Sequence, residues 1–327
     1  MTCLNKEKEK AIADFWTSSQ TGTFLGVDKV RLAYVKIVQS SSCANIVIAS
    51  GRSEGYLKYQ ELAYDLAQRG YNIFIHDHRG QGLSQRLLEN PHKGYVKNFD
   101  HYADDLATFI RTIVHESADQ KPTFLLAHSM GSAIALRTLQ KYPHLVSRAT
   151  LCSPMIAINF GKIPNWIAKT IIKIGLTINQ CFSTKPWYFI GHKNYQPAAF
   201  ENNPLMDCPA RFERFIHLYQ LVPRLQLGGV TYQWLAQALR VNKRILQELS
   251  NIKDPITVLQ ASDDKIVDNK AQNDFCRQLH HESSLLCQPH PIVISGAKHE
   301  LLFDIDARRD QALAHIYQSF ETVDVGS

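Results

Sequence analysis

Short apolar runs alternate with longer amphipathic segments along most of the chain. Seven runs read as strands: Val30–Val38, Asn45–Ser50, Tyr71–His76, Thr123–Ala127, Ala149–Cys152, Ile256–Gln260 and Pro291–Ile294. Segments with the 3.6-residue spacing of helices follow most of them, at Tyr59–Gln68, Phe99–His115, Ala133–Tyr142, Asp268–Leu279 and Ala307–Phe320. Unbroken apolar strands are typical of a sheet covered on both faces. The pattern therefore predicts an α/β fold, with a mostly parallel central sheet flanked by helices.

The alternation stops between about residues 155 and 246. This segment is rich in helical spacing, beginning with Ile163–Ile178, and has few strand candidates. We expect a helical lid at 155–246, inserted between a first core part at 1–154 and a second at 247–327. Residues before about Thr23 are expected to form a polar lead-in with a short helix at Ala11–Trp16.

Composition is ordinary for a globular protein, but its charge is unevenly distributed. The 327 residues are 45% hydrophobic and 20% charged, with a net charge of +6. That charge is too small to indicate a nucleic-acid partner. The predicted lid holds 11 lysines and arginines and only 3 acidic residues, whereas the rest of the chain is nearly neutral. The lid is therefore a candidate surface for an anionic membrane.

Cysteines and apolar stretches indicate the compartment. The 7 cysteines are scattered without a Cys-x-x-Cys pattern, which favours reduced thiols. Residues 1–10 carry charges with no apolar run after them, and no run reaches the roughly 20 residues of a membrane span. We expect a cytoplasmic protein, at most peripheral to the inner face of the cell membrane.

One apolar run ends abruptly at a serine. Thr123–Ala127 is followed by His128-Ser129-Met130-Gly131 and then by a helix-forming run. A strand, a sharp turn and a helix are typical of a nucleophile elbow, which lifts the serine hydroxyl clear of the sheet. Ala127 and Gly131 are small, as the close crossing of strand and helix requires. A small-x-Ser-x-Gly pattern alone is weak, so the hypothesis depends on a base and an acid downstream.

An acid and a histidine follow the last two predicted strands. Asp263 and Asp264 come after Ile256–Gln260, and His299 comes after Pro291–Ile294. The carboxyl ends of parallel strands meet at one edge of a sheet, so these groups can converge on Ser129. The chain order Ser, Asp, His is that of an α/β-hydrolase triad. Either aspartate can serve at this point, whereas Asp268 is expected to cap the next helix.

Backbone N–H groups are expected to stabilise the oxyanion. The start of the helix after the elbow offers the N–H of Met130. The loop after Asn45–Ser50 offers a second, because Gly51 permits a tight turn that leaves the Arg52 N–H facing inward. The glycine-rich loop Asp77–Ser84 is expected to be a scaffold in which Asp77 and Arg79 pair or bond backbone groups.

No metal or cofactor site is indicated. His76, His78 and His128 lie near the predicted site but lack the spacing of metal ligands. The sequence has neither Gly-x-Gly-x-x-Gly nor a P-loop. We therefore expect chemistry carried by side chains alone.

These motifs together resemble the serine α/β-hydrolases of the monoacylglycerol lipase type, and more closely the bacterial lysophospholipases among them. The resemblance rests on 45–55, 77–84, 128–131, Ser153-Pro154-Met155, 264–268 and 297–301, and on 59–66 and 227–234, so it covers nearly the whole chain, lid included. It favours Asp264 as the acid. Two positions depart from the family: Ala127 stands where glycine is usual, and Ser50 where histidine often precedes the oxyanion-loop glycine.

The resemblance implies a lysophospholipase that hydrolyses a monoacyl lipid ester through an acyl-enzyme. The alternatives are a monoacylglycerol lipase or general carboxylesterase and, in another class, a non-catalytic lipid-binding relative. The basic lid weakly favours a phosphate-bearing head group. Lid residues that are candidates for binding the acyl chain are Trp166, Ile167 and Ile171.

Overall fold

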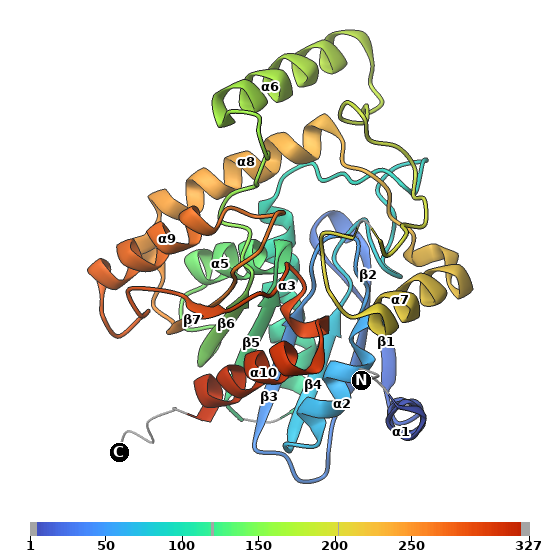
Figure 1. The fold of residues 1–327 in the computed structure, drawn as a ribbon, viewed down its shortest axis with the longest axis vertical. Helices are drawn as coiled ribbons and strands as arrows, with labels where there is room; N and C mark the ends of the chain where they lie inside the picture. The colour runs from blue at the N-terminus through green and yellow to red at the C-terminus, as the bar shows by residue number, and fades with distance from the viewer. Residues whose placement is uncertain (1–4, 119–120, 202, 322–327) are drawn as a thin grey trace.

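The computed structural model describes residues 5–118, 121–201 and 203–321, and its described part contains an eight-stranded mixed sheet (Figure 1). The strand order is β1-β2-β4-β3-β5-β6-β7-β8. Pairs β1–β2 and β2–β4 are antiparallel, and every other pair is parallel. The mostly parallel sheet predicted from the apolar runs is confirmed. The strands are β1 Gln20–Leu25, β2 Arg31–Ile37, β3 Ala44–Ala49, β4 Tyr71–His76, β5 Thr123–His128, β6 Arg148–Cys152, β7 Ile256–Ala261 and β8 Ile292–Ile294.

Helices cover both faces of this sheet (Figure 1). Side chains of α3, α5, α8 and α9 belong to the core on one face, and those of α2, α7 and α10 to the core on the other. The helices are α1 Lys6–Trp16, α2 Gln60–Ala67, α3 Asp100–Phe109, α4 His115–Ser117, α5 Met130–Lys141, α6 Asn165–Phe182, α7 Pro209–Leu221, α8 Tyr232–Gln247, α9 Asn269–Glu282 and α10 Asp306–Glu321. Shorter turns are η1 Val27–Lys29, η2 Tyr56–Tyr59, η3 Ile110–Val114, η4 Pro223–Leu225, η5 Leu249–Asn251 and η6 Leu301–Phe303.

Strand β3 shows why its sequence is apolar at every position. Val47 and Ala49 pack into the core on the face of α5, whereas Ile46 and Ile48 pack into the core on the face of α10. Alternate side chains of a strand point to opposite faces, so a strand covered on both sides needs apolar residues throughout. All six residues of β3 are buried.

Strand β1 corrects the prediction of a polar lead-in. Gln20–Leu25 pairs along its whole length with β2 at the edge of the sheet. Only Phe24 is buried in this strand, because an edge strand has one neighbour and stays largely in solvent. A strand with so little buried surface leaves no apolar run in the sequence. The preceding helix is also longer than expected, spanning Lys6–Trp16.

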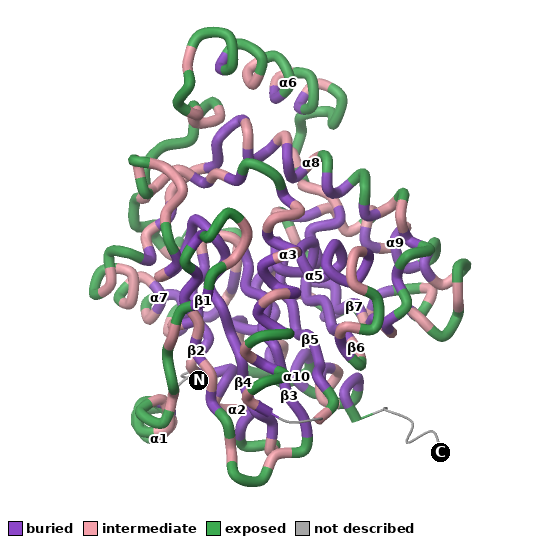
Figure 2. Tube along the Cα trace, turned by 180° about the vertical axis from the view of Figure 1, so that it is seen from behind, coloured by how far each residue is buried: buried purple, intermediate pink, exposed green. Residues whose placement is uncertain are grey.

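The segment between β6 and β7, residues 153–255, contains α6, α7, η4 and α8. Helix α6 packs on α8 and stands beyond it, away from the sheet (Figure 1). Its outer surface is mostly exposed (Figure 2). The helix begins at Asn165 and ends at Phe182, slightly later at both ends than predicted. Among the described residues, no helix has both the length and the apolarity that crossing a membrane would require.

Candidate active site

Ser129 occupies a sharp turn between β5 and α5. Its backbone is left-handed, with φ 53° and ψ −115°. The turn is fixed on both sides, since the Ser129 N–H donates to the Cys152 carbonyl (3.0 Å) and the Met155 N–H donates to the Ser129 carbonyl (3.1 Å). A Cβ atom on Gly131 would lie 2.1 Å from the Ala49 carbonyl oxygen, so only glycine fits where α5 crosses β3. This is the strand–turn–helix arrangement that the sequence predicts, except that the helix starts at Met130.

The structure brings Ser129, His299 and Asp264 together in one hydrogen-bonded chain. The Ser129 hydroxyl donates to His299 Nε2 over 2.8 Å, and His299 Nδ1 donates to Asp264 Oδ2 over 2.7 Å. Ser129 lies on the turn after β5, Asp264 after β7, and His299 after β8. All three follow the carboxyl ends of parallel strands, which is why residues 170 positions apart meet. The arrangement can pass the proton of a hydroxyl to an imidazole that a carboxylate orients.

Asp264, and not Asp263, reaches the histidine. Its other oxygen, Oδ1, accepts the N–H groups of Ile266 (2.8 Å) and Val267 (3.1 Å). Burial acts to raise the pKa of Asp264, but the hydrogen bond and charge of His299 and the two N–H groups outweigh it and lower the pKa. The carboxylate therefore stays ionised. Asp263 is exposed and accepts from Ser262 Oγ instead (2.9 Å).

Asp268 caps the next helix, as predicted. Its side chain accepts the N–H groups of Lys270 (2.9 Å) and Ala271 (3.3 Å) at the start of α9. Both are N–H groups of a first helical turn, which have no carbonyl partner within the helix. The carboxyl of Asp268 thus has a structural task, which separates it from Asp264.

The two expected oxyanion donors lie on neighbouring segments. Met130 is the first residue of α5, so its N–H precedes the first hydrogen-bonded turn. Arg52 lies in the loop after β3, and β3 is the parallel neighbour of β5. The Arg52 side chain is not a loose surface group: it donates to the Gly228 carbonyl and lies 5.5 Å from the centre of the Trp234 ring. Through these contacts it ties the oxyanion loop to the segment that contains α8.

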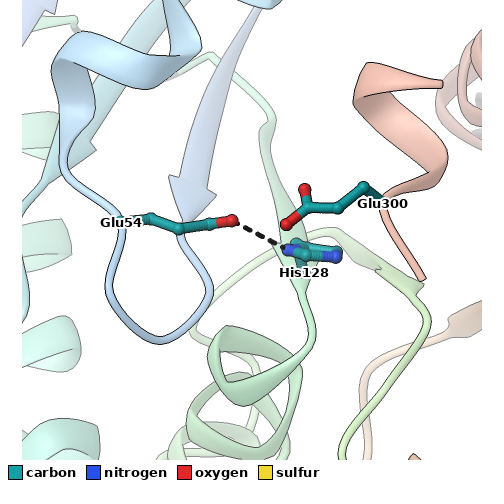
Figure 3. A group of neighbouring side chains, drawn as sticks. All are labelled: Glu54, His128 and Glu300. Atoms are coloured by element: carbon teal, nitrogen blue, oxygen red, sulfur yellow. Dashed lines mark ion pairs between the residues drawn. The ribbon is translucent and has the colours of Figure 1, made fainter. Parts of the chain in front are cut away.

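A buried polar cluster supports this loop from behind (Figure 3). Glu54 Oε2 accepts the Gly51 N–H (2.5 Å) and the Tyr59 hydroxyl (2.5 Å), and Glu54 Oε1 lies 3.6 Å from His128 Nδ1. Glu300, the residue after the predicted base, belongs to the same group of side chains. The cluster therefore joins the oxyanion loop, the residue before Ser129 and the loop that holds His299.

The ammonium of Lys58 occupies the centre of the cluster. It donates to Glu54 Oε1 (2.5 Å) and to both oxygens of Glu300 (3.0 and 2.9 Å). Glu54, His128 and Glu300 have the donor types of a metal site. The carboxylates, however, already have a cationic partner in Lys58, so their charge is balanced by the chain itself.

Electrostatics keep this cluster charged despite its burial. Burial acts to raise the pKa of Glu54, but Lys58 and His128 hold it well below its ordinary range. Burial disfavours the charged imidazole of His128, but Glu300 and Glu54 outweigh this effect and raise its pKa. His128 Nε2 also donates to the His299 carbonyl (3.3 Å). Sequence reasoning noted His128 as near the site but missed Glu54, Lys58 and Glu300.

The loop Asp77–Ser84 is the scaffold that was predicted. Asp77 accepts the N–H groups of Tyr56 (2.5 Å) and Leu83 (2.6 Å), and Arg79 pairs with Asp105 (2.6 Å). Gln81 adds a contact that the sequence did not suggest, because its amide nitrogen donates to the carbonyls of Gly51 (2.8 Å) and Glu54 (2.9 Å). The loop thereby fixes both ends of the oxyanion loop.

The predicted acyl-chain residues lie on α6. Trp166 is 70% exposed. Ile167 and Ile171 are half-buried, while Ala168 and Ile172 are buried. Binding of substrate by Trp166, Ile167 and Ile171 stays a prediction.

Comparisons with known proteins identify the family of the chain. Residues 40–306 match the family described as "Serine aminopeptidase, S33". Lysophospholipase L2 of Escherichia coli is 34% identical over 309 residues, covering 94% of this chain and 89% of that protein. A probable lysophospholipase L2 of Haemophilus influenzae is 34% identical over 304 residues, covering 92% of each.

A solved structure shows the same fold. A soluble variant of monoglyceride lipase from Saccharomyces cerevisiae, in complex with a substrate analog, superposes with a TM-score of 0.70 at 18% identity, covering 91% of this chain and 93% of that one. The predicted α/β-hydrolase fold is thus confirmed. Because the family match spans most of the sequence and the Escherichia coli relative is 34% identical along nearly all of it, the chain belongs to the Hydrolase_4 family of serine hydrolases, as a homologue of lysophospholipase L2.

Proposed function

We propose that the protein is a lysophospholipase that cleaves the fatty-acyl ester of lysophospholipids through Ser129, His299 and Asp264. The observation that carries the proposal is the chain of hydrogen bonds from Ser129 Oγ to His299 (2.8 Å) and from His299 to Asp264 (2.7 Å). Its substrate class is supported by the two lysophospholipase L2 relatives, which match this chain over more than nine-tenths of its length.

The proposed reaction is acyl transfer in two steps. Ser129 Oγ attacks the ester carbonyl while His299 Nε2 takes the hydroxyl proton, and Asp264 stabilises the imidazolium that forms. The N–H groups of Met130 and Arg52 donate to the oxyanion. His299 then gives its proton to the leaving glycerol oxygen. Water, activated by His299, releases the fatty acid from the acyl-Ser129 ester.

We infer that residues 155–246 act as a lid that takes up the single acyl chain. Support comes from α6 and the residues next to it, where several large apolar side chains are exposed although Ala168 and Ile172 are buried. Ile163, Ile174 and Phe182 are 50%, 54% and 79% exposed. A large exposed apolar surface usually marks a binding surface.

We further propose that α6 docks on the anionic inner face of the cell membrane. Residues 155–200 contain five lysines and no aspartate or glutamate. Lys162, Lys169 and Lys173 are exposed. Each such charge near an anionic surface contributes about 1 kcal/mol. Apolar and basic side chains on one exposed helix are the combination that interfacial helices use.

Ser129→Ala tests the enzyme and its substrate class. Release of fatty acid is measured from lysophosphatidylethanolamine, lysophosphatidylcholine and monoacylglycerol of the same acyl chain. We expect turnover of the lysophospholipids that falls by about 10⁴-fold or more in the variant. Ser132→Ala is the matched control, since Ser132 is buried one turn further along α5.

Each other outcome points to a named alternative. Serine-dependent turnover of monoacylglycerol alone would indicate a monoacylglycerol lipase or general carboxylesterase with the same site. Lipid binding without serine-dependent turnover of any of these esters would indicate a non-catalytic lipid-binding relative.

A further inference from the structure

A cavity of about 500 Å³ lies beside the start of β2, between the loop that follows β4 and the η4 turn. Its lining includes Arg31, Arg86, Arg224, His92, Gln85 and Gln226. None of the residues described as lining it is acidic. We call it the arginine cavity. It lies apart from the hydrogen-bonded chain of Ser129, none of whose members lines it.

The three arginines make no ion pair with any carboxylate among the residues that the structure describes. Their recorded contacts are with backbone carbonyls: Arg86 donates to Gly82 (2.9 Å) and Arg224, and Arg224 donates to Leu83 (2.9 Å). A guanidinium carries five N–H donors, so these bonds leave most of them free for a ligand. His92 has a buried Nδ1 atom that finds no hydrogen-bond partner in the described part of the chain.

The nearby carboxyl of Asp77 does not balance this charge within the cavity. Its two oxygens accept the backbone N–H groups of Tyr56 and Leu83, and it does not line the cavity. Burial lowers the pKa of Arg86 to about 10; Asp77 acts against this effect, and the neighbouring charge of Arg224 adds to it. Arg86 therefore remains cationic at neutral pH, and neither Arg86 nor Arg224 forms an ion pair with a carboxylate among the described residues.

We propose that the arginine cavity is a phosphate-binding site, separate from the catalytic serine. The planar fork of a guanidinium matches the oxygens of a phosphate, and side-chain amides such as those of Gln85 and Gln226 add neutral donors. The site is shared between two parts of the chain. Arg31 and Arg86 belong to the sheet domain, whereas Arg224 lies in the segment between β6 and β7, so a bound phosphate holds the two together.

Calorimetric titration of the intact protein with inorganic phosphate tests the site. Arg224→Gln and Arg31→Gln replace exposed side chains, and Arg240→Gln is the matched control on the exposed face of α8. We expect saturable binding whose Kd rises about tenfold or more in each of the first two variants and is unchanged in the third, because each bond to a charged group is worth that factor. Unfolding midpoints of all variants verify that they fold.

The absence of saturable phosphate binding would overturn the proposal, as would binding that neither Arg224→Gln nor Arg31→Gln weakens. Either result is independent of turnover, because the titration can be run on Ser129→Ala protein. The proposed phosphate site can therefore be refuted or supported independently of the proposed lysophospholipase function.

Kinetics distinguish the two sources of the phosphate. If the cavity takes the head group of the lipid substrate, Arg224→Gln raises KM for lysophosphatidylethanolamine and leaves KM for monoacylglycerol unchanged. If it takes free phosphate, the variant loses phosphate binding and neither KM changes. Both results support a phosphate site, and they differ only in its occupant.

Discussion

Ser129 has a backbone conformation that residues other than glycine rarely adopt. A φ of 53° with ψ −115° costs on the order of 1–3 kcal/mol and persists only where the surroundings impose it. Here the imposing contacts are the hydrogen bonds to Cys152 and Met155 and the tight crossing at Gly131. The strain leaves the hydroxyl pointing at His299, which is the geometry that nucleophilic attack needs.

Asp264→Asn should separate the two adjacent aspartates. An amide cannot stabilise the imidazolium of His299 and favours the wrong tautomer, so kcat should fall by about 10⁴-fold. Asp263→Asn is the matched control and should stay within a few-fold of the wild type, because the exposed side chain of Asp263 accepts from Ser262 and does not reach His299. A larger loss in Asp263→Asn than in Asp264→Asn would contradict the assignment. Steady-state hydrolysis of lysophosphatidylethanolamine provides the comparison.

His128→Gln should alter how stability depends on pH. The pKa of folded His128 is raised above its ordinary value of 6.5, so its charged form stabilises the fold below that pH, and the contribution is lost as pH rises through the raised pKa. The free energy of unfolding should therefore differ most between wild type and variant at about pH 5.5–6.5 and least in alkali.

Urea unfolding at several pH values measures this difference. The exposed His217→Gln of α7 is the control for the exchange of a histidine and should change the free energy of unfolding little. If the difference in unfolding free energy between wild type and His128→Gln instead grew as pH rises, His128 would be neutral in the folded protein.

Sequence reasoning succeeded for residues that follow a recognisable strand. Ser129, Asp264 and His299 each come directly after an apolar run, so their convergence follows from the sheet alone. Lys58 and Glu300 are 242 positions apart, and nothing local indicates that they pair. Glu54 is only three residues from Gly51, but its contact depends on how the loop folds. Buried ion pairs of this kind need the tertiary structure.

At the scale of elements, α6 differs from the other long helices because so much of its apolar surface is exposed. Trp166, Ile174 and Phe182 are 70%, 54% and 79% exposed, whereas the apolar residues of α5 are buried. The sequence predicted a helix here from its isoleucine spacing. Its spacing places Ile167, Ile171, Ile174 and Ile178 on one side, which would ordinarily be the buried side, yet the structure leaves Ile174 and Ile178 exposed.

Trp166→Ser and Phe182→Ser should weaken membrane binding if α6 docks. Each loses an exposed aromatic side chain worth about 1.5–3 kcal/mol when buried in lipid, so vesicle affinity should fall roughly tenfold or more. Leu285→Ser is the control, since Leu285 is 86% exposed in the loop after α9. Co-sedimentation with phosphatidylcholine vesicles, with and without phosphatidylglycerol, gives the affinities. If the wild-type protein bound both kinds of vesicle equally, docking on an anionic surface would be excluded. If all variants bound the vesicles as tightly as the wild type, docking through α6 would be excluded.

At the scale of the whole molecule, charge is divided between parts of the chain. Several basic residues of the segment between β6 and β7 pair with carboxylates elsewhere, as Arg211 does with Glu61 (2.7 Å) and Arg244 with Asp100 (2.8 Å). Lys162, Lys169 and Lys173 near α6 and Arg224 of the arginine cavity make no such pair among the described residues, whereas Lys185 pairs with Glu89 (2.9 Å). These unpaired cations account for the two binding surfaces that we propose.

The apolar pattern of the sequence predicted the inner strands of the sheet but not its edge strand β1. Strands β2 to β7 bury most of their residues and therefore leave apolar runs that can be read directly. Strand β1 buries only Phe24 and was missed. The boundaries 1–154, 155–246 and 247–327 remain a proposal, supported by the position of α6 to α8 between β6 and β7.

Trapping the acyl-enzyme would show directly whether Ser129 is the nucleophile. Wild-type protein is mixed with lysophosphatidylethanolamine, and the reaction is quenched with acid during turnover. The protein is then digested, and the masses of its peptides are measured by mass spectrometry. We predict one acyl group on the peptide that contains Ser129, and none in Ser129→Ala protein. Fatty acid released without any acyl-peptide, or an acyl group on another residue, would contradict the mechanism.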